Sequence, residues 1–419
     1  MKAAALGLAV FVLLFAIVFW SIRLRDLIQG LRRVPDIDPE RYVGLPEDAP
    51  LISVIVPAHN EEAFIKECLE SVLAQDYPRF ELICVDDRSQ DRTAEIVGSV
   101  FQDSERCRLL SAGELPSGWT GKCHALNSAV AHARGDWLAF LDSDSTLEKS
   151  ALRQCYHEAT IHGVNLVSLT PRFLMRTFWE KVLQPTFGAM CCILFPLGKV
   201  NDPSSDVACA NGMFYMISRR AYERIGGHGA VRNLAVEDVG IGKIVKALGL
   251  GILMANGRRI LKTRMYTNFC DIVKGWTRIL SASMNYELST AVRYLLIHSV
   301  MSFPVLAAAL YVYVPTAMEL WPSTWFILPL VCAVQMVVVP SIFYSTWGLP
   351  RSCSICLILG NLVLIWVLAV IVKKILCKDC LQWRGTTYFS SLYEPRTIDP
   401  ETSQIYSSLP SNRILEKAK

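Results

Sequence analysis

Two acidic residues stand two positions apart, directly after an apolar run. Residues 138–141 have the pattern of a short buried strand, and Asp142 and Asp144 follow it. Carboxylates held this close repel each other and favour a hard divalent cation such as Mg²⁺ or Mn²⁺, which also binds substrate phosphate. Both would lie at the carboxyl edge of a sheet, where open α/β sheets bind ligands. For this triplet alone, a solvated turn is the simpler alternative.

Four further charged residues begin or follow expected elements. Lys122 begins a helix after a Gly/Pro-rich loop, and because the helix dipole disfavours a cation there, a functional role is favoured. Glu237 and Asp238 begin another helix, whose dipole favours anions, so ordinary helix-terminus chemistry is an alternative. Asp87 follows an apolar run, and capping the next helix is the alternative to a functional role at the end of this strand.

The elements that must position these residues alternate in type along the chain. Apolar runs predict strands at 51–56, stopped by Pro57, at 80–85, at 108–110 and up to Asp142, with helix-like segments between them. This alternation predicts an α/β domain with a mixed, mostly parallel sheet and helices on both faces. No Gly-x-Gly-x-x-Gly follows the first strand, which argues against a dinucleotide-dependent dehydrogenase.

Nine short motifs follow one another along residues 50–285. They are Val56-Pro-Ala-His-Asn-Glu-Glu62, Val85-Asp-Asp87, Gly121-Lys-Cys-His-Ala-Leu-Asn127, Leu141-Asp-Ser-Asp144, Asn211-Gly212, Gly226-Gly-His228, Val236-Glu-Asp238, Arg264-Met-Tyr266 and Lys274-Gly-Trp-Thr-Arg278. Taken in order, these motifs resemble those of family 2 glycosyltransferases of GT-A fold. The likeness is strongest to membrane-bound enzymes of hopanoid, carotenoid or other lipid glycosylation.

The resemblance implies a donor that is a nucleotide-diphosphate sugar, with a UDP-sugar favoured, and Mg²⁺ or Mn²⁺ as cofactor. Asp144, with Asp142, would hold a metal that neutralises the departing diphosphate. Asp238, with Glu237 beside it, would be the general base for the acceptor hydroxyl, and a single displacement would invert the anomeric configuration. Expected donor contacts are Pro57, Asn60, Glu61, Asp87, Lys122, Asp142, Trp276 and Arg278.

The segment around Trp276 departs from the Gln/Arg-x-x-Arg-Trp motif of processive family members. This departure favours transfer of one or a few sugars over polysaccharide synthesis. Trp276 could stack on a sugar or lipid headgroup and Arg278 could pair with diphosphate. An interfacial helix anchored by Trp276 is an equally good interpretation of the same residues. The spacing of His59, His124 and His228 indicates no zinc site.

The ends of the chain are apolar. Residues 1–24 predict a transmembrane signal anchor, because an uninterrupted apolar run is followed by arginines, and the positive-inside rule then places the next residues in the cytoplasm. A linker is expected at 25–50, the GT-A domain with interfacial elements at 51–285, two or three membrane helices at 290–375, and a juxtamembrane motif with a mobile tail at 376–419.

The number of membrane spans is open. Segments 294–314, 325–343 and 355–372 are each long enough to span. Three spans would leave the tail outside, whereas the lysines after the last one argue for inside, so a stretch around Pro304 or Pro340 could be re-entrant. Residues 173–198, which contain two prolines, predict a membrane-surface element or a buried core helix.

The composition of the chain limits which class of protein it can be and which partners it can bind. The chain is 52% hydrophobic with a net charge of only +4, so no nucleic-acid partner is indicated. Most of the 14 cysteines are expected to be reduced, and the apolar stretch between the two Cys-x-x-Cys pairs argues against a shared zinc. The expected protein is a multi-pass membrane enzyme, of the inner membrane if bacterial, acting on a lipid acceptor. Alternatives are a polysaccharide or polyprenyl-phosphate glycosyltransferase and a catalytically silent scaffold.

Overall fold

The computed structural model describes residues 2–317, 323–349 and 351–378, apart from Leu45, Glu47 and Asp103, together with the short segments 381–383 and 386–388. The chain forms two compact units. The sheet unit comprises Arg33–Leu174, Phe195–Met265 and Cys380–Lys419, and the helical unit comprises Met1–Arg32, Met175–Leu194 and Tyr266–Asp379.

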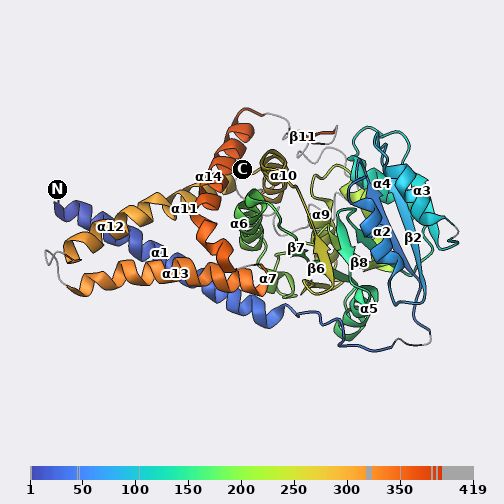
Figure 1. The fold of residues 1–419 in the computed structure, drawn as a ribbon, viewed down its shortest axis with the longest axis horizontal. Coiled ribbons are helices and arrows are strands. Elements are labelled where there is room, and N and C mark those ends of the chain that lie inside the picture. The colour runs from blue at the N-terminus through green and yellow to red at the C-terminus, as the bar shows by residue number, and fades with distance from the viewer. Residues whose placement is uncertain are drawn as a thin grey trace. The chain divides into compact units, whose positions relative to one another are not determined.

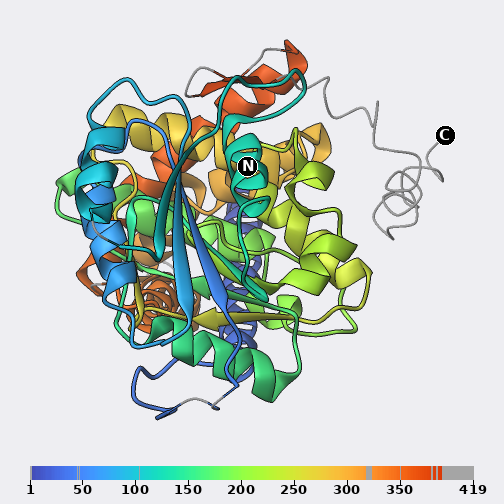
Figure 2. The same cartoon turned by 90° about the vertical axis from the view of Figure 1, so that its right-hand side faces the viewer.

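A seven-stranded sheet in the order β3-β2-β1-β4-β8-β6-β9 forms the centre of the sheet unit (Figures 1 and 2). Strands β1 to β4 are parallel, and β8 enters antiparallel between β4 and β6. The predicted mixed, mostly parallel sheet is therefore confirmed. The strands are β1 Ile52–Ala58, β2 Phe80–Asp86, β3 Cys107–Ser111, β4 Trp137–Leu141, β6 Leu166–Thr170, β8 Phe214–Ser218 and β9 Ile252–Asn256.

Helices cover both faces of this sheet, as expected. On one face α2 (Ile65–Leu73), α3 (Thr93–Phe101) and α5 (Ala151–His162) bury their apolar sides in the main core. The other face carries α4 (Gly121–Val130), α8 (Arg219–Arg224), the 3₁₀ turn η1 (Gly227–Val231) and α9 (Glu237–Ala247), which pack on one another. Helix α7 (Leu197–Val200) packs beside β9.

A second, three-stranded sheet lies at the carboxyl end of β4. Its order is β5-β10-β7, with β5 at Ser145–Leu147, β7 at Arg172–Phe173 and β10 at Leu261–Thr263. Because β5 begins one residue after Asp144, this small sheet fixes the backbone next to the acidic pair.

Pro57 does not stop the first strand, contrary to the prediction. It pairs with Val85 inside β1. Backbone groups alternate in direction along a strand, and the carbonyl of Leu51 accepts a hydrogen bond from the β4 residue Trp137. The N–H that Pro57 lacks would therefore point towards β4. Pairing with β4 ends at Ile55, so proline costs no ladder hydrogen bond there.

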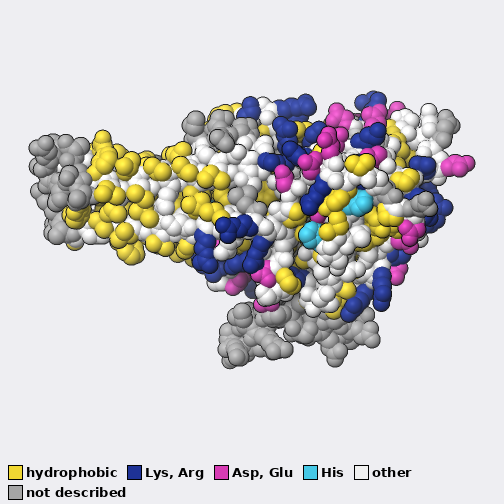
Figure 3. Space-filling view, turned by 90° about the horizontal axis from the view of Figure 1, so that it is seen from below, with side chains coloured by type: hydrophobic (Ala, Val, Ile, Leu, Met, Phe, Trp, Pro, Cys, Tyr) yellow, Lys and Arg dark blue, Asp and Glu magenta, His cyan; other side chains and the backbone are white. Residues whose placement is uncertain are grey.

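The helical unit is built from long apolar helices. These are α1 (Lys2–Arg33, of which Arg33 belongs to the sheet unit), α6 (Phe178–Leu194), α10 (Phe269–Ser283), α11 (Leu288–Val300), α12 (Phe303–Ala317), α13 (Ile327–Thr346) and α14 (Leu357–Leu376). Exposed apolar side chains gather over α1, α12 and α13 (Figure 3). In the described part of the chain, five segments are long and apolar enough to cross a membrane: Ala4–Gly30, Phe178–Val200, Leu288–Pro315, Ile327–Thr346 and Leu357–Leu376.

One of the expected membrane segments has an interrupted helix. Segment 294–314 is not one continuous helix, because a turn at Met301 and Ser302 separates α11 from α12 just before Pro304. Pro340, in contrast, lies inside α13 without ending it. Within 173–198, α6 contains Pro185 and ends at Leu194, and that segment's role at a membrane surface stays a prediction.

The remaining expectations concern the cysteines and the C-terminal tail. All 13 cysteines in the described ranges are free, as expected. The juxtamembrane motif is described only as two short paired strands, β11 (Leu381–Trp383) and β12 (Thr386–Tyr388). Arg384, Gly385 and the tail from 389 lie outside the described residues.

Candidate active site

The acidic pair lies where the sequence predicts, beyond the end of β4. The N–H of Asp142 donates to the carbonyl of Met213, which precedes the antiparallel neighbour β8. One carboxylate oxygen of Asp144 accepts hydrogen bonds from the hydroxyls of Ser145 and Thr263, each at 3.2 Å. The carbonyl of Asp144 also accepts the N–H of Arg264 at 3.2 Å. The central sheet and the small sheet together hold this turn.

Lys122 joins Asp142 to the acidic start of α9. Its Nζ lies 2.7 Å from Oδ1 of Asp142 and 2.8 Å from Oε1 of Glu237. Thr120 caps the helix that carries it, accepting the N–H of Cys123. Burial alone would lower the pKa of Lys122, but the nearby carboxylates raise it well above its usual value. The ammonium therefore stays charged and binds both acidic groups, which offsets its unfavourable position at a helix N-terminus.

Asp238 adds a third carboxylate to this cluster. Its Oδ2 accepts the backbone N–H of Gly212 at 2.6 Å, and Oδ1 accepts the N–H of Val239 at 2.8 Å. A Cβ at Gly212 would lie 3.0 Å from Asp238 Oδ2 and 3.2 Å from Lys122 Nζ, so a glycine allows the backbone to come this close.

The two neighbouring carboxylates of α9 titrate differently. Burial and the charge of Glu237 raise the pKa of Asp238 to about 7. Burial would also raise the pKa of Glu237, but the charge and hydrogen bond of Lys122 lower it below its usual value. Such separation of two adjacent carboxyl groups is typical of acid–base sites, with Asp238 able to gain or lose a proton near neutral pH.

Asp87 lies at the end of β2 and is not used as a helix cap. Its Oδ1 accepts the Nε–H of Arg88 at 2.9 Å, whereas Asp91 accepts the N–H of Thr93 at the start of α3. A side chain at Gly121 would collide with Asp87 Oδ2, so Asp87 lies against the residue that precedes Lys122. This contact places Asp87 beside the Lys122 cluster.

The loop after β1 is fastened to the loop after β2. Asn60, in the left-handed region at φ 56°, donates its N–H to the hydroxyl of Ser89, and its Oδ1 accepts the N–H of Gln90 at 2.8 Å. The side chain of Glu61 is buried, and its carbonyl accepts the N–H of Ile65, which starts α2. Pro57 lies one residue before the end of β1. Their predicted contacts with a donor remain predictions.

Trp276 and Arg278 lie on α10 of the helical unit. The indole of Trp276 is buried, stacks on Phe187 at 5.4 Å between ring centroids, and donates its N–H to Gln184 at 2.9 Å. These contacts account for Trp276 as a packing residue, and the predicted donor contacts of both residues stay predictions.

Two of the histidines near the motifs, His59 and His228, have polar contacts through their rings. The ring nitrogens of buried His228 lie 3.0 Å from the hydroxyl of Tyr215 and 2.7 Å from that of Tyr222. Burial lowers the pKa of His228 to about 3, so the ring is neutral. His59 Nδ1 lies 2.5 Å from the carbonyl of Asp87. Among the described residues, no group of three or more His, Cys, Asp or Glu side chains could hold a metal.

The acidic pair nevertheless fits a divalent cation bound together with a phosphate-bearing ligand. Mg²⁺ commonly takes one or two carboxylates and completes its coordination with waters and substrate phosphates. One carboxylate oxygen of Asp142 is already paired with the ammonium of Lys122, whereas the carboxylate of Asp144 is oriented by two hydroxyl groups. Asp144 is therefore the better candidate for a direct ligand, with Asp142 beside it.

Two residues of this site were not expected from the sequence in these roles. Gly212 was part of a motif without an assigned role, and Thr263 was not singled out. Thr263 reaches Asp144 only because β10 pairs with β5, and these strands have three residues each. Their pairing carries no pattern that a single sequence reveals.

Comparison with known proteins agrees with the predicted family. Residues 53–226 match the family model described as glycosyl transferase family 2. A 4,4'-diaponeurosporenoate glycosyltransferase from Staphylococcus aureus (strain USA300) is 27% identical over 236 residues, which cover 55% of this chain and 60% of that protein. The match thus spans about three fifths of the length of these curated relatives.

Solved structures show looser similarity. The mannosyltransferase PcManGT from Pyrobaculum calidifontis, in complex with GDP-Man and Mn²⁺, is 19% identical with a TM-score of 0.49, covering 85% of this chain and 98% of the other. Glucosyl-3-phosphoglycerate synthase from M. tuberculosis is 25% identical with a TM-score of 0.38, covering 57% and 82%.

Proposed function

We propose that this chain transfers a sugar from a nucleotide-diphosphate donor to a membrane lipid, with inversion at the anomeric carbon, because residues 53–226 match the family model of glycosyl transferase family 2. Asp238 carries this proposal. It is a carboxylate with a pKa of about 7, held by the Gly212 N–H next to an acidic pair at the edge of the sheet. A general base is most effective when its pKa lies near the working pH.

Each residue of the site has its own chemical role in this proposal. Asp238 takes the proton of the acceptor hydroxyl as that oxygen attacks the anomeric carbon. Lys122 keeps Asp142 and Glu237 in place and presents a positive charge to the donor diphosphate. Asp87, beside the Lys122 cluster, is suited to hydrogen bonding with the base or ribose. A Mg²⁺ or Mn²⁺ held by Asp144 and Asp142 would supply charge neutralisation for the leaving diphosphate.

The lipid acceptor and the membrane location belong to the same proposal. Five segments are apolar enough to span a bilayer, and the staphylococcal relative is named for the glycosylation of diaponeurosporenoate. Arginines after the apolar part of α1 favour a cytoplasmic side for the chain that follows. We therefore place transfer at the cytoplasmic face of a multi-pass protein.

A polysaccharide or polyprenyl-phosphate glycosyltransferase is the nearest enzymatic alternative. Product analysis with a labelled donor and membrane lipid separates the two. A glycolipid carrying one or a few sugars supports the proposal, whereas long sugar chains support a synthase.

A thermal-shift screen of the purified protein tests the donor. Each nucleotide sugar is added with and without Mg²⁺ or Mn²⁺, and a ligand present at about 100 times its Kd stabilises the native state by about 2.7 kcal/mol. A UDP-sugar that raises Tm only with metal is the expected result. If no nucleotide sugar raises Tm under any metal condition, a catalytically silent scaffold replaces the enzyme.

A further inference from the structure

One face of α9 contacts the chain segment 199–212 at three successive turns. Asp238, Gly242 and Lys246 are spaced four residues apart, so the three positions lie along one side of the helix. The first of these contacts is the hydrogen bond from the Gly212 N–H to Asp238. The same face that carries the proposed base therefore also holds the segment that contacts it.

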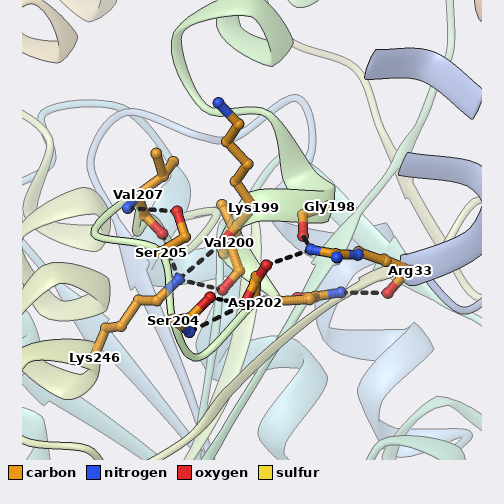
Figure 4. Close-up of polar contacts among 10 residues, drawn as sticks. Arg33, Gly198, Lys199, Val200, Asp202, Ser204, Ser205, Val207 and Lys246 are labelled. Carbon is orange, nitrogen blue, oxygen red and sulfur yellow. Dashed lines mark hydrogen bonds and ion pairs between the residues drawn. The ribbon is translucent and has the colours of Figure 1, made fainter. Parts of the chain in front are cut away.

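Lys246 makes the last of the three contacts. Its Nζ donates to the carbonyls of Lys199, Val200 and Val207 at 2.9, 2.7 and 2.6 Å (Figure 4). Lys199 and Val200 are the last two residues of α7, and the carbonyl of Lys199 also accepts the backbone N–H of Asp202 at 3.2 Å. An ammonium has three N–H groups, so each carbonyl can receive one of them.

Gly242 makes the middle contact. A Cβ there would lie 2.6 Å from the backbone nitrogen of Ala210 and 2.6 Å from the carbonyl carbon of Cys209. Backbone atoms of the segment thus rest directly on the helix, two residues before Gly212. Between Lys246 and Gly212 the segment has little room to move without losing one of these contacts.

We propose that Lys246 is a positioning residue for the reaction: by fixing residues 199–207 against α9, it sets the position of the Gly212 N–H that orients Asp238. This inference rests on the proposed function, because it assigns Lys246 a role through the base Asp238. Lys246 lies two helical turns from Asp238, and its ammonium donates to three backbone carbonyls of segment 199–212.

A second anchor could make Lys246 unnecessary. Asn211 donates its N–H to the hydroxyl of Ser168 at 2.8 Å and its side-chain amide to the carbonyl of Leu169 at 3.0 Å. If this attachment to β6 alone positions Gly212, removal of the Lys246 ammonium changes only stability. The two possibilities differ in what happens to turnover of the folded enzyme.

The test compares Lys246→Met with Lys246→Arg and Lys199→Met in the full-length protein. Arginine keeps the charge and the donors, and the side chain of Lys199 points away from Lys246 (Figure 4), so its removal is a matched loss of one lysine. For Lys246→Met we expect kcat to fall about 10- to 100-fold, as small misplacements of catalytic groups do. Donor Kd should change less than about twofold, with partial rescue in Lys246→Arg and wild-type kcat in Lys199→Met.

Hydrogen exchange in residues 199–212 provides a readout that does not depend on activity. We expect faster exchange there in Lys246→Met and wild-type exchange in Lys199→Met. Faster exchange with unchanged kcat would overturn the positioning role. Unchanged exchange would show that Lys246 does not fix residues 199–207 against α9. A wild-type protein that transfers no sugar would overturn the proposed function instead, while the exchange result would still decide whether Lys246 fixes the segment.

Discussion

Carboxylates at the two ends of the central sheet have an opposite charge balance. At the amino end of β2, Glu81 accepts hydrogen bonds from the hydroxyl of Ser53 at 2.7 Å and the Nε–H of Arg134 at 3.0 Å, and it pairs with Arg108. At the carboxyl end, Lys122 is the cation that pairs with both Asp142 and Glu237.

The pKa values reflect this difference. Burial alone would raise the pKa of Glu81, but its hydrogen bonds from Ser53, Arg134 and Arg108 lower it. The pKa of Asp238 is instead raised to about 7 by burial and by Glu237. A carboxylate with enough partners stabilises the fold, whereas a surplus of carboxylates can bind a cation or accept a proton.

The largest effect is expected from Asp238→Asn. Asparagine keeps the shape and its single oxygen can still accept the Gly212 N–H, but it loses the acceptor for the Val239 N–H and cannot take a proton. We expect kcat to fall about 10²- to 10⁴-fold, the usual value of a general base, with donor binding retained. Steady-state transfer rates and donor Kd, measured on the same preparation, check this. Wild-type kcat would show that Asp238 belongs with Glu81 as a structural residue.

Asp144→Ala should act on binding rather than on proton transfer. If Asp144 holds the metal, donor affinity in the presence of Mn²⁺ should fall about 100-fold, corresponding to about 3 kcal/mol. Donor affinity without metal should be unchanged. Titration calorimetry with and without Mn²⁺ measures both, and Ser145→Ala, which removes one hydrogen-bond donor to Asp144, is a milder companion variant. Equal donor loss in Asp144→Ala and Asp238→Asn would contradict the division of roles.

The acidic end of the sheet was predictable because apolar runs show where strands end. The positions of Asp142 and Asp87 follow from that rule alone. The contacts that tune the site depend on strand order instead. β8 inserts antiparallel beside β4, and this brings Gly212, just before β8, to Asp238 at the start of α9. No local pattern announces such an insertion.

One error has a local physical cause. The rule that proline ends a strand failed at Pro57, because pairing on the side of its missing N–H had already ended. The expected segment 294–314 lies within the candidate span Leu288–Pro315, and the turn that breaks its helix comes just before Pro304, where the sequence allows a re-entrant stretch. Hydropathy reports how apolar a segment is but does not report a break in its helix.

The pH dependence of kcat and of stability should reveal the raised pKa of Asp238, with a moderate effect on the rate. Asp238 must be deprotonated to act, so kcat should fall about tenfold per pH unit below about 7 and level off above it. Its contribution to stability has the opposite sign. Because the folded pKa is higher than the unfolded one, this contribution is present in full below about pH 4 and is lost as pH rises through about 7. Rate profiles and Tm at each pH test both, and a kcat that is flat between pH 5 and 8 would exclude Asp238 as the base.

The smallest effect on catalysis should come from Glu81→Gln, the corresponding change at the other end of the strands. Glutamine cannot form the two ion pairs, and its amide places a donor among donors, so we expect a loss of about 1–3 kcal/mol in the free energy of unfolding. The side chains of Arg108 and Arg134 are 34% and 68% exposed, so their guanidiniums regain water, which limits the cost. Denaturant unfolding measures the loss, and kcat of the folded enzyme should stay within about twofold of wild type because Glu81 is at the opposite end of β2 from Asp87. A kcat that fell in proportion to the Asp238 variant would mean that the charges at both ends of the sheet act on one reaction, and the contrast between them would fail.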